Sequence, residues 1–444
     1  MPVRCRHHTR LSLLVGLSLC LVCPPAQALT IDQAIARALP HDASVVSADS
    51  RRRSADLELI RSRRWLPSNP YFNTTISSST FEQSTGSGSQ PGELAPGTEN
   101  YGPAFTFFLE QEVEIAGQRS LRVRSGEQSH QITELNEIQA KRNAEAKVKT
   151  AFLTALMQRD LLQVEEDSLH WEREAEDGRD GERGQGIGRT EEETRVWRAR
   201  RAQRAALRQL EESMGELRHM IRATPAEALT LEGSLPNPLA GELPPLDTLL
   251  AIARRERADL QSQRLVAEWS QVQLTLAKRN EIPSPSLSVF VSHDENGQQY
   301  GGGIGIPLPI FESPALDVRA AAVDLDKARE DVGNLEARME AEVRAAYLSC
   351  TATAEDLRDL QQQILPRLRR IAEQRDKQFD RGQATAGQII DAEMDVLDAR
   401  RDEINVLAEH ALAMVELERV VGAPPIEVNA SGGTTSPEEQ NAAE

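Results

Sequence analysis

The chain has 444 residues, of which 27% are charged, with 51 Lys and Arg against 69 Asp and Glu. This length exceeds that of one ordinary domain, and the net charge of −18 argues against nucleic acid as a partner. No stretch after residue 28 supplies the roughly 18 uncharged apolar residues that a spanning helix needs, so a bundle of membrane helices is excluded.

Residues 1–28 have the three parts of a secretory signal peptide. Three arginines precede an apolar run over 11–22, and the small residues of Ala26-Gln27-Ala28 follow it. The sequence predicts cleavage after Ala28. The mature chain then holds 48 basic and 69 acidic side chains, a net charge of −21, so the exported protein is distinctly acidic.

Cysteine usage indicates the redox context. Cys20 and Cys23 leave a lipid-anchored N terminus open, although each follows a bulky residue where such signals favour a small one. In the simpler alternative both leave with the signal peptide, as does Cys5, and Cys350 has no partner. We expect an exported protein that folds without a disulfide.

The mature chain contains an internal duplication. Four short matches occur in the same order at offsets of 195 to 200 residues, and such regularity exceeds chance. The matched segments are 148–153 with 343–348, 183–185 with 381–383, 199–201 with 399–401, and 223–225 with 423–425. The sequence therefore predicts two structural repeats, each with the order helix, strand, strand, long helix, turn, helix.

The predicted elements follow in chain order. The first repeat spans 29–222, with helices over 31–65, 113–177 and 190–222, strands over 71–80 and 101–111, and a tip turn over 178–189. Five prolines mark a non-helical linker over 223–245. The second repeat spans 246–423, with helices over 246–280, 314–378 and 387–421, strands over 284–293 and 300–311, and a tip turn over 379–387. The tail over 424–444 is expected to be disordered.

The helix lengths predict a rod. A helix of 65 residues extends about 98 Å, and the two shorter helices of a repeat together match that length, so they can run antiparallel alongside it. Apolar residues recur every seven positions along 318–371, which is typical of coiled-coil packing. Cys350 falls on this seam and is expected to be a buried hydrophobe, and Pro366 is expected to bend the second long helix.

Four segments carry no charge, namely 71–80, 101–109, 284–292 and 300–311. With short extensions they hold 10 of the 17 aromatic residues. Their alternating apolar residues indicate strands, and a tilted strand of ten residues fits the apolar band of an outer-membrane barrel. The side chains expected to face lipid are Phe105, Phe107, Leu287, Val289, Val291, Ile304, Ile306, Leu308 and Ile310.

Two ordinary hairpins on a soluble core are the alternative, but the lack of charge on both faces, the aromatic residues and the signal peptide favour membrane strands. Four strands cannot close a barrel, and open strand edges are not tolerated in lipid. Three copies would supply twelve strands, an even number within the known range. The predicted fold class is mainly α with a small membrane β-barrel. In it, a homotrimer shares a 12-stranded barrel that continues into a long periplasmic α-helical coiled-coil barrel.

Over nearly its whole mature length the chain resembles the TolC-type outer-membrane efflux proteins, or outer membrane factors. The matching features are Leu29-Thr-Ile-Asp-Gln-Ala-Ile-Ala-Arg-Ala38, Pro67 before the first strand, Gly382 nine residues ahead of Asp391, and the duplication. Residues 111–119 and 303–311 are similar to the cobalt-zinc-cadmium (heavy-metal) resistance branch. Glu312-Ser-Pro-Ala315 departs from the Asn-x-Gly turn that is usual in that branch.

The resemblance implies a channel in the outer membrane of a Gram-negative bacterium, with its helical part in the periplasm. The implied partners are outer-membrane lipid, a periplasmic adaptor (membrane fusion) protein and a proton-driven inner-membrane pump of the resistance-nodulation-division (RND) type. The implied function is the passive exit of divalent heavy-metal cations. A channel of the same fold for multidrug efflux or type I protein secretion, and a periplasmic coiled-coil scaffold or adaptor, remain alternatives.

In the family, the turns between helices form the periplasmic tip that meets the adaptor. The positions that match are Arg183, Gly184, Gln185, Arg381, Gly382 and Gln383. Family channels narrow near the tip through acidic rings. Asp391 matches one ring position, whereas Gln388 stands where a second acid is expected. Threefold symmetry would bring three Asp391 carboxylates together and favour bound cations; a solvated acidic helix face is the alternative.

The sequence contains no constellation typical of catalysis or metal binding. Its mature histidines show no ligand spacing with cysteine or with each other. The glycine-rich run over 184–188 follows a predicted helix and lacks the Lys-Ser/Thr ending of a phosphate loop. We therefore expect neither an enzyme nor a cofactor, and no metal site within the chain.

Overall fold

A computed structural model describes residues 27–77, 104–179, 187–224, 227–237, 243–294, 297–308 and 314–424. Most of the predicted signal peptide, the first tip turn and the C-terminal tail lie outside these residues. Helices make up most of the described chain, so the prediction of a mainly helical fold is confirmed.

The first repeat contains the strands β2 and β3 between two groups of helices. Its helices are α1 (Ile31–Ala38), the 3-10 turn η1 (Leu39–His41), α2 (Ala43–Ser62), α3 (Gln118–Arg179) and α4 (Ile187–Met220), and its strands are β2 (Tyr71–Ser77) and β3 (Ala104–Glu112). The second repeat contains α5 (Leu246–Glu256), α6 (Ala258–Asn280), β5 (Ser286–Asp294), β6 (Gly297–Gly305), α7 (Pro314–Asp359), the π turn η3 (Leu360–Ile364), α8 (Leu365–Asp380) and α9 (Ala386–Val421).

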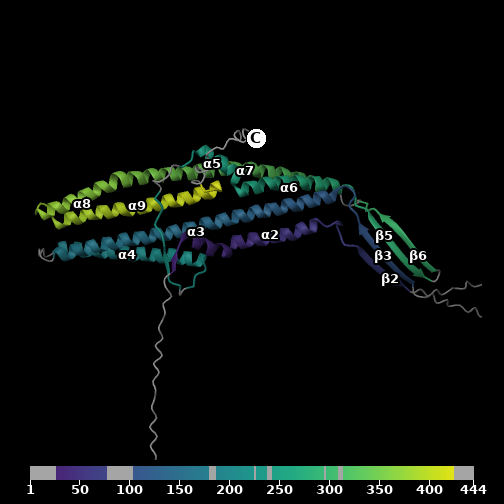
Figure 1. Cartoon of the computed structure of the whole chain (residues 1–444), viewed down its shortest axis with the longest axis horizontal. Helices are drawn as coiled ribbons and strands as arrows, with labels where there is room; N and C mark the ends of the chain where they lie inside the picture. The colour runs from purple at the N-terminus through teal and green to yellow at the C-terminus, as the bar shows by residue number, and fades with distance from the viewer. Residues whose placement is uncertain are drawn as a thin grey trace, which may run out of the picture.

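These helices form an elongated slab with the strands at one end (Figure 1). Near the strands, α3 lies between α2 and α6, and α6 also contacts α7. Toward the other end, α3 lies between α4 and α9, and α9 also contacts α7 and α8. The shorter helices α2 and α4 therefore lie end to end along α3, as their lengths require. Each half of the slab is four helices wide, and its two sides are α2 with α4 and α7 with α8.

The helix predicted over 31–65 is not continuous, so that prediction is wrong. Pro40 lies in the η1 turn, where its missing N–H and fixed φ end α1. Asp42 then begins α2 as its N-cap, because its Oδ1 accepts hydrogen bonds from the backbone N–H groups of Ser44 at 2.8 Å and Val45 at 3.3 Å. This second helix ends at Ser62, short of the predicted 65.

The helix predicted over 246–280 is also broken, at Arg257. The backbone of Arg257 is extended, with φ −68° and ψ 114°, and its guanidinium is almost fully buried. It donates to Asp259 Oδ2 at 2.7 Å, to Glu342 Oε2 at 2.9 Å and to the Val420 carbonyl at 3.5 Å. The break lets one side chain join α6, α7 and the end of α9. Burial alone would raise the pKa of Asp259, but the hydrogen bonds from Arg257 outweigh it and hold that pKa below its usual value.

The second long helix is interrupted ahead of the predicted bend. Residues 360–364 form a π turn, and Pro366 lies in the first turn of α8. Because proline lacks an N–H, it cannot form the regular i to i−4 hydrogen bond inside a helix. The π turn accommodates the hydrogen bond that Pro366 cannot form, so the helix continues to the tip.

The strand boundaries also need correction. The last strand occupies 297–305 instead of 300–311, because Pro307 and Pro309 have no N–H to donate to a ladder. A further pair was not predicted: β1 (Gln27–Leu29) runs parallel to β4 (Leu229–Leu231). It joins the start of the described chain to the linker between the repeats.

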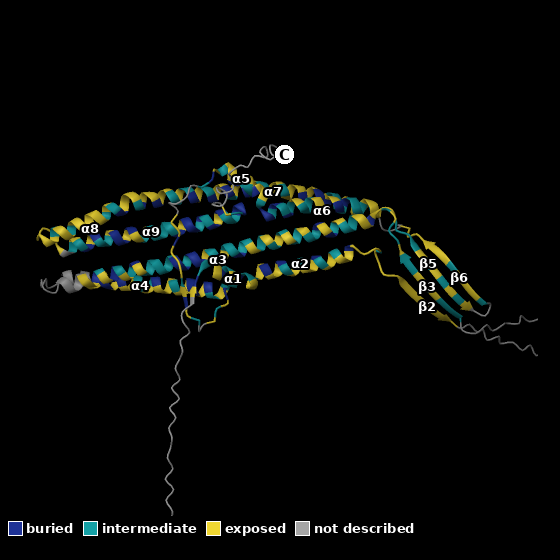
Figure 2. Cartoon of the chain, viewed as in Figure 1, coloured by how far each residue is buried: buried dark blue, intermediate teal, exposed yellow. Residues whose placement is uncertain are grey.

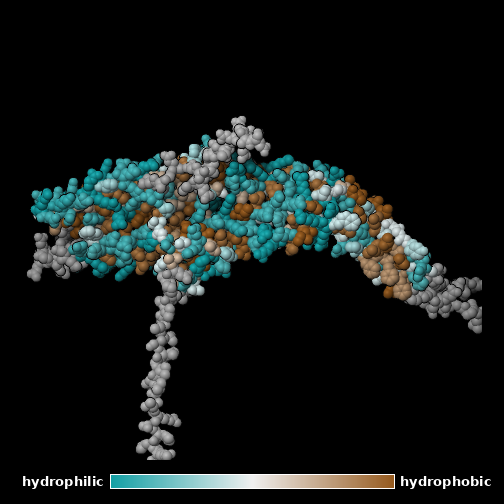
Figure 3. Space-filling model, in the orientation of Figure 1, coloured by the Kyte–Doolittle hydropathy of each residue, from teal (hydrophilic) through white to brown (hydrophobic). Residues whose placement is uncertain are grey.

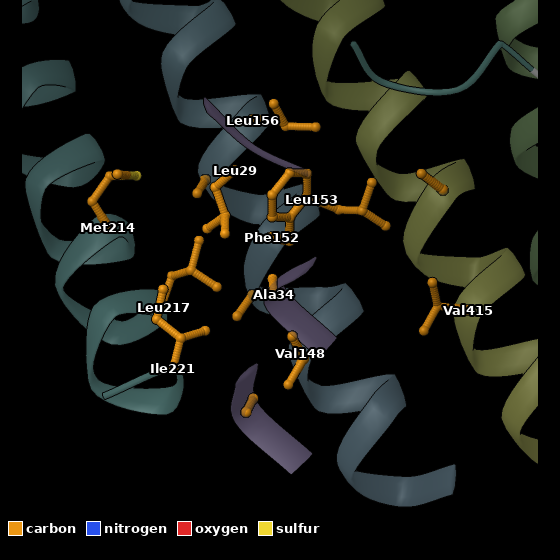
Figure 4. Packing of buried hydrophobic residues seen from close by; sticks show 14 of the residues in the cluster. Leu29, Ala34, Val148, Phe152, Leu153, Leu156, Met214, Leu217, Ile221 and Val415 are labelled. Atoms are coloured by element: carbon orange, nitrogen blue, oxygen red, sulfur yellow. The ribbon is translucent and has the colours of Figure 1, made fainter. Parts of the chain in front are cut away.

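The main core lies at the middle of the slab, where four helices meet. Figure 4 shows Phe152 and Leu156 of α3 among Leu217 of α4, Val415 of α9 and Leu29. A second cluster joins α5, α7 and the end of α9 and contains Cys350, which is fully buried. The predicted role of Cys350 as a buried hydrophobe is confirmed, and burial raises the pKa of its thiol to about 12.

Candidate functional site

The four strands form one antiparallel sheet in the order β2-β3-β5-β6. The central β3–β5 pair joins the two repeats, with Phe107 opposite Val291 and Leu109 opposite Val289. Within the described residues, β2 and β6 each pair on one side only. The sheet therefore has two open edges.

One face of this sheet is apolar and exposed. Side chains directly opposite one another lie on the same face, and the register places the large hydrophobic residues together. This face carries Phe72, Ile76, Phe105, Phe107, Leu109, Leu287, Val289, Val291, Tyr300 and Ile304. Most of them are about half exposed or more, and Ile304 is 72% exposed. Apolar side chains gather over the strand end of the slab in Figure 3.

Six of the nine side chains expected to face lipid lie on this apolar face: Phe105, Phe107, Leu287, Val289, Val291 and Ile304. Ile306 and Leu308 are exposed but follow the end of β6, and Ile310 lies outside the described residues. The register thus brings residues from both repeats onto one continuous surface. Phe72 and Phe107 add a stacked pair, with ring centroids 6.4 Å apart.

The opposite face is mostly small and polar, although Phe108 and Phe290 lie opposite each other on it. Ser286, Ser288 and Ser292 of β5 lie opposite Gly305, Gly303 and Gln299 of β6. The ring of Phe290 covers Gly301, where a Cβ would lie 2.7 Å from its Cε1 and Cζ atoms. Glycine is therefore required at 301 while Phe290 keeps this position. The two faces of the sheet therefore differ in polarity.

The other end of the slab carries the predicted tip. Gly382 has φ +68°, a conformation that favours glycine, and its N–H donates to the Phe379 carbonyl at 2.8 Å. The N–H of Gln383 donates to the Gln378 carbonyl, also at 2.8 Å, so this turn closes α8 in the manner of a glycine C-cap. Arg381, Gly382 and Gln383 are exposed. Their first-repeat counterparts Arg183, Gly184 and Gln185 lie outside the described residues.

Gln388 has a structural role that the sequence analysis missed. Its Oε1 accepts a hydrogen bond from the Thr385 N–H at 3.0 Å, as the third residue of a capping box does. The Thr-x-x-Gln spacing before an apolar run could have revealed this role. A side chain that caps α9 explains why glutamine suits this position.

Asp391 lies on the exposed face of α9, between the buried Ile390 and Ala392. Its Oδ1 is 3.5 Å from Nη1 of Arg195 on α4, so an ion pair joins the helices of the two repeats near the tip. Both side chains are well exposed, and such pairs stabilise a fold only weakly. Two residues further along α9, burial and then the nearby charge of Asp376 raise the pKa of Glu393. The tip of α9 thus presents several carboxylates in a small region.

Within the described ranges, no group of three or more His, Cys, Asp or Glu side chains could hold a metal ion. No helix of the described chain is both long and apolar enough to cross a membrane.

Comparison with known proteins supports this architecture. Residues 249–423 match the family described as outer membrane efflux protein. No curated protein matches the chain.

Solved structures share the fold at low sequence identity. The chain is similar to the Neisseria gonorrhoeae MtrE outer membrane channel in its open state, with 16% identity, 89% of each chain covered and a TM-score of 0.72. It is similar to the Campylobacter jejuni CmeC outer membrane channel, with 16% identity, 88% of this chain and 85% of that chain covered, and a TM-score of 0.71. It is also similar to CusC, with 14% identity, 88% and 92% covered, and a TM-score of 0.70. The resemblance to outer-membrane efflux proteins is therefore confirmed, in sequence over the second repeat and in fold over most of the chain.

Proposed function

We propose that the protein is the outer-membrane exit channel of a tripartite efflux system and passively conducts divalent heavy-metal cations. In this proposal an RND pump and a periplasmic adaptor deliver the cations, and the channel spans the outer membrane of a Gram-negative bacterium. The observation that carries the proposal is the exposed apolar face of a two-edged sheet at the end of a long helical slab. That surface suits lipid, and its open edges require partners there.

The two long sides of the helical slab support assembly from identical subunits. Exposed positions run along α2 and α4 on one side of the slab and along α7 and α8 on the other (Figure 2). Leu57 and Ile60 are exposed on α2, and Leu316 and Val323 are exposed on α7. Both pairs lie near the strand end of their helix, because α2 ends and α7 begins beside the strands.

The α2 side and the α7 side of the slab are different surfaces, and both carry exposed apolar residues. Contact between one subunit's α2 side and the next subunit's α7 side is a head-to-tail arrangement, which closes into a ring when the rotation between subunits allows it. Leu316, Val323, Ala337, Ala341 and Leu348 of α7 share one side of the helix, as positions seven or four apart do. Glu330 lies on the same side, and Leu348 is 65% exposed. Such a stripe suits the side of a neighbouring α2. Three subunits joined in this way would pool twelve strands, the arrangement that the homotrimer proposal requires.

A charged residue on the apolar strand face should prevent insertion. We expect Val291→Arg to lower the amount of protein in the outer membrane at least several-fold, because Arg on the lipid side of a barrel costs about 2–4 kcal/mol at the bilayer centre. The neighbouring Ser292→Arg, on the polar face, is the matched control and should insert well. Quantitative blotting of membrane fractions makes the comparison, and equal insertion of both variants would contradict the assignment of the faces.

The proposed gate role of Asp391 can be separated from its ion pair with Arg195. In planar bilayers, Asp391→Ala should weaken cation preference and block by divalent cations, because a ring of carboxylates is removed. Arg195→Ala removes the counter-charge and should preserve or strengthen both. The gate assignment fails if Asp391→Ala conducts and is blocked like the wild type.

The cargo is tested in cells. A strain lacking the protein should become more sensitive to one or more of cobalt, zinc, cadmium and related divalent cations, and the wild-type gene should restore resistance. Sensitivity to organic compounds or loss of a secreted protein, with unchanged metal resistance, would instead assign the channel to multidrug efflux or type I secretion. A protein that fractionates away from the outer membrane would be a periplasmic scaffold.

A further inference from the structure

A polar groove lies near the middle of the slab, and the channel proposal does not use it. It has a volume of about 1040 Å³ and is lined by residues of α2, α3, α4 and α9. Because its walls reach from α2 across α3 to α9, the groove opens on a broad face of the slab and not on either of its long sides. We call it the central groove.

The central groove lies on the face opposite α1 and α5. Ala34 of α1 lies beside Phe152 of α3 (Figure 4). At 100° per residue, Asn143 of the groove lies about 180° around α3 from Phe152. On α9, Leu417 belongs to the cluster with α5, and Arg419 of the groove lies about 160° around the helix from it. Helices α1 and α5 therefore form a second layer on the other broad face.

In the ring proposed above, on which this inference rests, one broad face of the slab lines the lumen. Twelve helices about 10 Å apart close a ring with a radius of about 19 Å, which leaves a lumen about 14 Å in radius. Three second layers of helices would fill most of that space. The second layer therefore lies outside the ring. The central groove then faces the lumen, where no neighbouring subunit covers it.

The α3 wall of the central groove carries polar side chains at a regular spacing. Positions three and four residues apart form a seam along a helix, and this seam holds hydroxyl, amide and ammonium groups in place of apolar side chains. Its polar members are Thr133, Asn136, Asn143, Lys147, Thr150 and Thr154. None of the six is buried. Such a wall suits a water-soluble ligand with several oxygen atoms.

The central groove is basic in an acidic chain. Arg51, Lys147 and Arg419 line it together with Glu216 and Glu416, which leaves one net positive charge. Glu416 is already engaged, because Arg419 donates to its carboxylate at 2.6 and 2.7 Å. Arg51 and Lys147 form no ion pair with a described carboxylate. These two cations are therefore available to an anion in the groove.

The two available cations lie at different levels of the groove. Arg51 precedes Arg52, which donates to Glu137 Oε2 of α3 at 2.6 Å. Lys147 lies ten residues beyond Glu137, about 15 Å along α3. A compact anion such as phosphate would contact one of the two cations, whereas a molecule with several carboxylates can contact both through their long side chains.

We propose that the central groove is a lumenal binding site for a small hydroxylated polycarboxylate. Arg51 pairs bidentately with one carboxylate and Lys147 pairs with another. Asn143 and Thr150 exchange hydrogen bonds with the hydroxyl group between them. Threefold symmetry places three such sites at one level of the lumen. Their charge is opposite to that of Asp391 near the tip, so the channel has separate sites for cations and for organic anions.

Citrate tests the proposal with the full-length trimer, in detergent and in planar bilayers. Titration calorimetry measures its binding at neutral pH and constant ionic strength without divalent cations, and inorganic phosphate is the compact anion for comparison. The site variant combines Arg51→Gln and Lys147→Gln. The control variant combines Arg53→Gln, about 200° around α2 from Arg51, with Arg255→Gln on α5. Both control positions are exposed, and the net charge changes equally.

We expect the wild type to bind citrate at least about tenfold more tightly than phosphate, because two charged pairs form instead of one. The site variant should bind citrate at least about tenfold more weakly than the wild type, and the control variant should bind it nearly as the wild type does. In bilayers, citrate should reduce the conductance of the wild type and the control variant but not that of the site variant. If the double variant does not assemble, Lys147→Gln alone gives the same comparison with a smaller charge change.

Equal loss of citrate binding in the site and control variants would overturn the proposal, because it would show a general charge effect. So would equal affinity for citrate and phosphate, or citrate binding that leaves the wild-type conductance unchanged. Conductance of the wild type separates this inference from the proposed function. A conducting channel that does not bind citrate overturns this inference alone. Citrate binding that depends on Arg51 and Lys147, in a protein that does not conduct, overturns the channel proposal and supports the groove as an anion site.

Discussion

Backbone hydrogen bonding at the strand edges is the constraint on which the proposed assembly depends. In lipid, an N–H or C=O group without a partner costs several kcal/mol, and the described sheet leaves one side of β2 and one side of β6 open. The apolar face of the same sheet is unsuited to water. Both problems are solved together if further strands pair at each edge, and identical chains are the simplest source of them.

The helical slab is organised in a way that agrees with this solution. It presents two unlike sides, with Leu57 and Ile60 on α2 and Leu316 and Val323 on α7. Near the middle, the buried Arg257 joins α6, α7 and the end of α9 through Asp259, Glu342 and the Val420 carbonyl. These contacts stabilise the second repeat at the point where the neighbour of α7 changes from α6 to α9. In the proposed ring, such a slab would hold the acidic residues of the tip at a fixed distance from the ring axis.

Much of this architecture could be predicted from the sequence because its periodicities are strong. Alternation in 284–292 and the seven-residue apolar repeat along α7 lead to the strands and the long helix, and the buried position of Cys350 follows from that repeat. The helix breaks were missed for physical reasons. Asp42 and Arg257 act through a cap and through long-range ion pairs, which a single helical pattern does not reveal. The end of β6 could be predicted, because Pro307 and Pro309 have no N–H to donate to a strand ladder.

At the candidate site, the register of the sheet could not be predicted from the sequence, because pairing between β3 and β5 joins residues 174 to 188 positions apart. The capping role of Gln388 was visible in the Thr385-x-x-Gln388 spacing. The ion pair between Arg195 and Asp391 was not, because it depends on how α4 and α9 are placed on either side of α3. The expected contacts of the tip with an adaptor stay predictions.

The most direct test of the shared ring is disulfide cross-linking with Leu57→Cys and Val323→Cys in one chain. These positions lie on opposite sides of the slab, so a bond between them joins two subunits, and the one cysteine expected in the mature chain, Cys350, is buried. The account predicts that oxidation in the outer membrane gives covalent dimers and trimers and nothing larger. A protein that stays monomeric, or a ladder that continues past three subunits, would contradict it.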